Sequence, residues 1–115
     1  MQALADEDTP TFVLTLVEEF LRDATAYLAA VCCAAEAADA TALERAAHTL
    51  KSASTSLGAL GMAALCQQLQ ELAHTGTVAG ATELLPQLTD EFTRVRQALA
   101  QVCAQLQDTL PSRQP

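Results

Sequence analysis

One histidine stands between two of the few cations in this chain. His48 has Arg45 three residues before it and Lys51 three residues after it, and Lys51 is the sole lysine. The whole chain of 115 residues has a net charge of −8, so this is a local positive spot on a negative molecule. Neutral imidazole is a good nucleophile at physiological pH, and nearby cations stabilise a transferring anion. The three residues therefore predict a site that handles an anionic group.

The residues around His48 have the spacing of an amphipathic helix. Apolar side chains recur every three or four positions, and Leu50 lies roughly 160° from His48 at about 100° per residue. We therefore expect the imidazole to face solvent, among small side chains that let another protein approach it. The polar residues expected on the same face are Arg45, Lys51, Ser52 and Thr55. The apolar stripe comprises Leu43, Ala46, Ala47, Leu50, Ala53 and Leu57.

This segment resembles the core motif of histidine-containing phosphotransfer (HPt) domains, which carry phosphoryl groups in bacterial and plant phosphorelays. The usual motif is His-x-Leu-Lys, a run of small residues and Leu-Gly, and residues 48–58 read HTLKSASTSLG. The family often has a cysteine eighteen residues after the histidine and a glutamine four residues later. These positions are Cys66 and Gln70 here, and the resemblance extends over roughly Phe12 to Leu106.

The resemblance implies a role for each of these residues. His48 would accept a phosphoryl group from a receiver-domain aspartate and pass it to another receiver, Lys51 would stabilise the phosphoryl charge, and Gln70 would orient the imidazole. The implied partners are receiver domains of a hybrid sensor kinase or a response regulator, which supply Mg²⁺, so that the chain needs no cofactor of its own. Two positions depart from the family, because Ser52 replaces the usual glycine and His74 replaces the usual arginine or lysine. The candidate binding residues are Arg45, Ser52, Thr55 and His74.

The chain lacks the motifs of an ATP-dependent kinase. It contains neither a Gly-rich nucleotide loop nor an acidic cluster suited to magnesium. We therefore expect a phosphoryl carrier that is not itself an enzyme, either free-standing or cut from a larger hybrid histidine kinase. Two other classes stay open. One is a non-catalytic helical interaction module in which His48 is dispensable, and the other is a metal site formed by His48, His74 and a cysteine.

Composition bounds the architecture and the setting. The length fits one domain, and apolar residues follow helical rather than alternating spacing, so we expect an all-α, antiparallel up-down four-helix bundle. The acidic balance disfavours nucleic acid and anionic membranes, and no run of about 20 apolar residues could span a bilayer. We expect a cytoplasmic monomer, or the cytoplasmic domain of a membrane sensor kinase. The expected segments are a flexible acidic tail (1–8), the bundle (9–108) and a flexible C-terminal tail (109–115).

Capping signals suggest where the helices begin and end. Thr9 and Pro10 resemble a helix start, a capping box at Thr41 and Glu44 opens the second helix, and Gly76 could cap the third. The expected helices cover about residues 12–35 (bent or split near Asp23), 41–57, 60–73 and 81–107, with Pro86 in the first turns of the last. Their expected inward residues include Phe12, Leu16, Phe20, Ala24, Tyr27, Leu28 and Val31, then Leu65, Leu69 and Leu72, then Leu84, Leu85, Leu88, Phe92, Val95, Leu99, Val102 and Leu106. The four cysteines are expected to be small buried hydrophobes in a reducing compartment.

Overall fold

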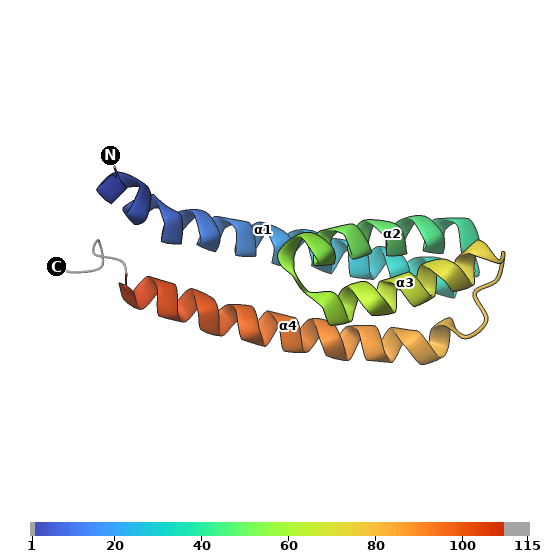
Figure 1. Cartoon of the computed structure of the whole chain (residues 1–115). Coiled ribbons are helices and arrows are strands. Elements are labelled where there is room, and N and C mark those ends of the chain that lie inside the picture. Colours follow the sequence, from blue (N-terminus) through green and yellow to red (C-terminus); the bar gives the residue numbers. More distant parts are fainter. Residues whose placement is uncertain (1, 110–115) are drawn as a thin grey trace.

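The structure is a computed structural model that describes the backbone of residues 2–109 and the side chains of residues 11–108. Over the described range the chain forms four helices and no strands: α1 (Gln2–Glu36), α2 (Ala40–Leu57), α3 (Leu60–His74) and α4 (Ala81–Thr109). The predicted all-α four-helix bundle is confirmed. In Figure 1, α2 and α3 form a short hairpin that packs against one end of the much longer α1 and α4.

The ends of α2 are fixed by two local signals. Asp39 is the N-cap, and its carboxylate accepts a hydrogen bond from the backbone N–H of Ala42 at 3.1 Å, so the capping box predicted at Thr41 and Glu44 is wrong. Aspartate at this position satisfies one of the free N–H groups of the first turn. At the other end, Gly58 adopts a left-handed φ of 91°, which suits glycine because it has no Cβ. The chain then enters α3 after a turn of two residues, which brings α2 and α3 together as antiparallel neighbours.

α1 begins earlier than the sequence signals indicate. The helix starts at Gln2, so the predicted start at Thr9 and Pro10 is wrong, and the stretch expected to be an acidic tail is helical from Gln2 onward. The residues before Thr9 include alanine, leucine, glutamine and glutamate, which favour helix and extend it past the capping signal. α1 also runs as one helix through Asp23, without the expected split. Met1 and residues 110–115, which were assigned to the tails, lie outside the described residues.

The core lies where all four helices overlap. Leu43, Leu50, Met62, Leu69 and Leu88 are fully buried there, together with Phe20, Ala24, Val31, Ala34, Ala47, Cys66, Ala73, Ala81 and Phe92. Six of the other predicted inward residues are partly buried and pack against this core: Tyr27, Leu28, Leu84, Leu85, Val95 and Leu99. In α3 the buried face is centred on Met62, Cys66, Leu69 and Ala73, whereas the predicted Leu65 and Leu72 are only half-buried. Ser54 is also fully buried, although no polar residue was expected in the stripe.

Three predicted core residues are exposed because the hairpin is too short to cover them. Phe12, Leu16 and Val102 are 62%, 44% and 41% exposed. At 1.5 Å per residue, the 35 residues of α1 span about 52 Å and the 18 residues of α2 about 27 Å. The two long helices therefore continue beyond the hairpin, where each has fewer neighbours to pack against (Figure 1). Helical periodicity alone carries no information about the length of the neighbouring helices.

Candidate functional site

Three pairs of side chains connect α2 to α3 across the surface of the hairpin. Glu44 pairs with His74, His48 with Gln70, and Lys51 with Gln67. Because the helices are antiparallel, each step of one turn forward along α2 is matched by an equal step backward along α3. We call these three pairs the cross-helix ladder. It places the histidine in the middle rung, with a carboxylate one turn before it and an ammonium group one turn after it.

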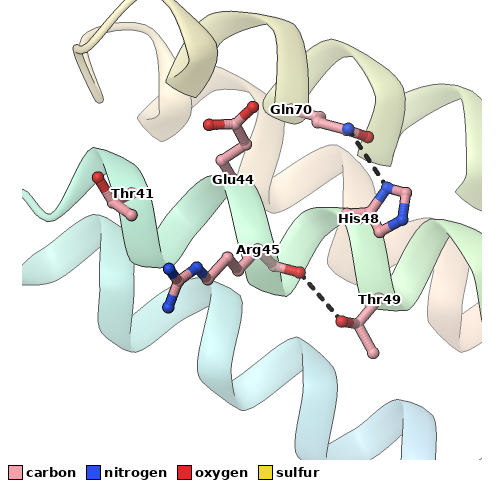
Figure 2. Close-up of a pocket in the computed structure, with 6 residues that line it drawn as sticks. All are labelled: Thr41, Glu44, Arg45, His48, Thr49 and Gln70. Carbon is pink, nitrogen blue, oxygen red and sulfur yellow. Dashed lines mark hydrogen bonds between the residues drawn. The ribbon is translucent and has the colours of Figure 1, made fainter.

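The middle rung holds the imidazole by one nitrogen. His48 is exposed, as its position opposite the buried Leu50 predicted, and its Nδ1 lies 3.3 Å from Nε2 of Gln70. Figure 2 shows the amide of Gln70 reaching the ring from α3 while the second ring nitrogen stays free of this contact. The Oε1 atom of Gln70 is buried and has no hydrogen-bond partner among the described residues. The ring is therefore oriented by a neutral amide and remains open to an approaching group.

The rung after the histidine holds Lys51. Its ammonium group donates a hydrogen bond to Oε1 of Gln67, and Nε2 of Gln67 donates in turn to the carboxylate of Glu71 at 2.7 Å. Both ends of the Gln67 amide are therefore used, which fixes its orientation. Lys51 is half-buried in this arrangement. Its charge is thus anchored to α3 on the same surface as His48, one turn away.

The rung before the histidine is an acid–histidine pair. Nδ1 of His74 lies 2.9 Å from Oε2 of Glu44. A carboxylate can only accept at this distance, so Nδ1 of His74 carries the hydrogen and donates it. His74 is highly exposed, whereas the side chain of Glu44 is about two-thirds covered. The structure thus gives His74 a defined partner on α2.

A shallow open hollow lies beside the imidazole. Its lining consists of Thr41, Glu44, Arg45, His48, Thr49 and Gln70. Arg45 lines this hollow, although Figure 2 shows its guanidinium group extending away from the ring. Ser52 and Thr55 are exposed on α2 and do not line the hollow. Thr41 was considered from the sequence only for a capping box, and Thr49 was not singled out, because its type does not distinguish it from an ordinary helix-surface threonine.

The structure does not support the alternative of a metal site. Among the described residues, no group of three or more histidine, cysteine or acidic side chains is arranged to hold a metal ion. Glu71 and His74 do have a Glu-x-x-His spacing, but Glu71 accepts from Gln67 and His74 pairs with Glu44.

Cys66 is fully buried, and burial raises the pKa of its thiol to about 12. It is therefore an inert core residue, as expected. Of the remaining cysteines, Cys33 is exposed and Cys32 and Cys103 are half-buried, so the expectation of burial is wrong for Cys33.

Comparison with known proteins assigns this arrangement to a class. Residues 15–98 match the model of the Hpt domain family, so the chain belongs to that family. Hpt domains are phosphoryl carriers of two-component phosphorelays, which interact with receiver domains and are not themselves kinases. The chain is also similar to a particular solved structure, histidine-containing phosphotransfer protein B (HptB) from Pseudomonas aeruginosa PAO1. The identity is 31%, the match covers 90% of this chain and 87% of HptB, and the TM-score is 0.78.

Two further observations complete the comparison. No curated protein matches the chain significantly. Over residues 2–109, no helix combines the length and the apolar character that crossing a bilayer requires. The family match and the HptB match together support a phosphotransfer role in a phosphorelay.

Proposed function

We propose that His48 is the phosphoacceptor, taking a phosphoryl group from the aspartate of one receiver domain and passing it to another receiver. The observation that carries this proposal is the middle rung of the ladder. The exposed imidazole is held at Nδ1 by Gln70, which leaves Nε2 directed away from this contact. In a family of phosphoryl carriers, an exposed and oriented imidazole is the group suited to carry the phosphoryl group.

The proton arrangement of this rung decides which nitrogen attacks. The two ends of the Gln70 amide have the same shape, so either its NH₂ or its oxygen can face Nδ1 of His48. With NH₂ toward the ring, Nδ1 accepts and Nε2 carries the hydrogen, so Nε2 has no free lone pair. With the oxygen toward the ring, Nδ1 donates and the lone pair of Nε2 is free. We assign the second arrangement to the reactive state.

The transfer step then balances without an external base. The lone pair of Nε2 attacks the phosphorus of the aspartyl phosphate, the N–P bond forms as the P–O bond breaks, and the aspartate leaves as a carboxylate. The hydrogen on Nδ1 stays in its bond to Gln70, so the ring becomes cationic, and the reverse reaction regenerates the neutral imidazole. The ammonium group of Lys51 offsets the charge of the transferring group. The Mg²⁺ that this chemistry requires belongs to the receiver domain.

The proposal extends to the partners, the location and the oligomeric state of the carrier. The receivers belong to a hybrid sensor kinase, to a response regulator, or to both, and the carrier works in the cytoplasm as a monomer. It is either a free-standing protein or a cytoplasmic domain of a membrane sensor kinase.

The test is phosphotransfer from phosphorylated receiver domains to the wild-type chain and to His48→Gln. We expect acid-labile, base-stable label on the wild type and none on the variant, with unchanged helical content by circular dichroism. Equal labelling of both proteins would exclude His48 as the phosphoacceptor. If folded wild-type protein accepts no label from a panel of receivers, the remaining hypothesis is an interaction module, in which the helical surface binds a partner without phosphoryl transfer.

A further inference from the structure

The phosphoacceptor has a carboxylate as a close neighbour. Glu44 lies one turn before His48 on α2, and both side chains line the same hollow. Side chains four residues apart on a helix have Cβ atoms about 5–6 Å apart. A free carboxylate at this position could therefore swing toward the group carried by the imidazole.

Such a carboxylate would oppose phosphorylation. A phosphoryl group carries close to two negative charges at neutral pH. Repulsion between it and a carboxylate about 7 Å away in a water-like dielectric corresponds to roughly a three- to tenfold effect on an equilibrium or a rate. The position of the Glu44 carboxylate consequently matters to the chemistry at His48.

Glu44 is not free, because α3 holds it. Its Oε2 accepts a hydrogen bond from Nδ1 of His74 at 2.9 Å, and Figure 2 shows the side chain directed toward α3 rather than toward the His48 ring. A second hollow, which adjoins the first through Glu44 and Gln70, has His74 in its wall. The carboxylate therefore sits at the boundary between the two hollows, on the side away from the imidazole.

We propose that His74 is a positioning residue that holds the Glu44 carboxylate away from the phosphoryl group on His48. This inference rests on the proposed function and adds the electrostatic control of its site. His74 acts through Glu44 and does not touch the phosphoryl group. Any side chain that donates a hydrogen bond to Glu44 from position 74 can do the same, and removing the carboxylate makes the restraint unnecessary.

The test uses phosphoramidate as the phosphoryl donor, so that no receiver domain has to be identified. Attack by His48 forms the N–P bond and releases ammonia. The proteins are the wild type, His74→Ala, His74→Arg, and His74→Ala combined with Glu44→Gln. Gln68→Ala is the matched control, since Gln68 is an exposed α3 residue outside the ladder. The rate of phosphohistidine formation and the half-life of the product are measured, with thermal unfolding of each protein.

The expected result is slower phosphorylation of His74→Ala, by up to about three- to tenfold, with normal rates for His74→Arg and the control and a rate at least equal to that of the wild type for the double variant. A purely structural role of His74 would not produce rescue by removing the charge of Glu44. The inference is overturned if His74→Ala reacts as fast as the wild type, or if the double variant stays as slow as His74→Ala. Absence of phosphohistidine in the wild type would instead overturn the proposed function.

Discussion

The buried thiol of Cys66 makes the stability of the bundle depend on alkaline pH. Cys66 is fully buried, and burial raises its pKa from 9.0 to about 12. The unfolded chain therefore releases this proton at a lower pH than the folded protein does. Since the folded pKa lies above the unfolded one, the stabilisation is fully present below pH 9 and is lost as the pH rises toward 12.

The size of this effect follows from the two pKa values. Each unit of pKa difference corresponds to about 1.4 kcal/mol. At pH 10.5, midway between 9.0 and about 12, the unfolding free energy should be lower by about 2 kcal/mol than at pH 8 through this group alone. A small domain has about 5–15 kcal/mol of stability in total, so the loss is easily measured.

The assay is urea unfolding under reducing conditions at pH 7.5, 8.5, 9.5 and 10.5, with wild type and Cys66→Ala compared at each pH. Other groups that titrate in this range are present in both proteins, including Cys32, whose raised pKa has the same sign of effect. Their contributions cancel in the difference between the two proteins. The advantage of the wild type should shrink by about 2 kcal/mol between pH 7.5 and pH 10.5. A difference that stays constant across the pH range would refute the reasoning.

Three further predictions concern stability and are checked by chemical unfolding at pH 7.5. Leu50→Ala should lower the unfolding free energy by about 2–5 kcal/mol because Leu50 is fully buried. The control Leu60→Ala, at a position 68% exposed, should change the unfolding free energy by less than about 0.5 kcal/mol. Equal losses in the two variants would contradict the assigned core. Gly58→Ala should lower the unfolding free energy by about 1–2 kcal/mol, because the backbone at Gly58 has a left-handed φ of 91°. The loss comes from the backbone conformation alone, since no atom lies within 4 Å of the position that the added Cβ would take. An unchanged unfolding free energy would show that the turn changes conformation. Gln67→Ala should lower the unfolding free energy by about 1 kcal/mol, because it removes the hydrogen-bond acceptor of the half-buried Lys51. The control Gln68→Ala, at an exposed neighbouring position, should cause no significant loss.

The pair in the middle rung of the ladder, His48 and Gln70, was expected before the structure was known. The pairs in the outer rungs were not. Helical phase was enough to predict that His48 faces outward, since the angle to Leu50 depends on local geometry alone. The contact with Gln70 came from the family resemblance and is observed. The pairing of Glu44 with His74 and of Lys51 with Gln67 was not predicted. It depends on the register between α2 and α3, which the two-residue turn at Gly58 sets and which periodicity within one helix does not contain.

The errors at the helix ends have a similar origin. The cap of the second helix was predicted at Thr41, yet the side chain of Asp39 is the N-cap of α2, because capping depends on which oxygen reaches the first free N–H groups. Phe12 and Leu16 follow the apolar periodicity of α1 correctly, but their burial depends on how far the hairpin extends along α1. Local patterns thus predicted the elements and the facing of His48, whereas relative lengths and register required the structure.

The cross-helix ladder has a consequence for how this surface can evolve. Each rung joins one α2 residue to one α3 residue, and neighbouring rungs lie a full helical turn apart. The unit that mutation can exchange is therefore a pair rather than a single residue. An acid and a histidine can be traded together for another donor and acceptor without disturbing the imidazole in the next rung. Paired substitutions at the outer rungs can thus change the charge beside His48 while the imidazole and its amide partner Gln70 stay in place.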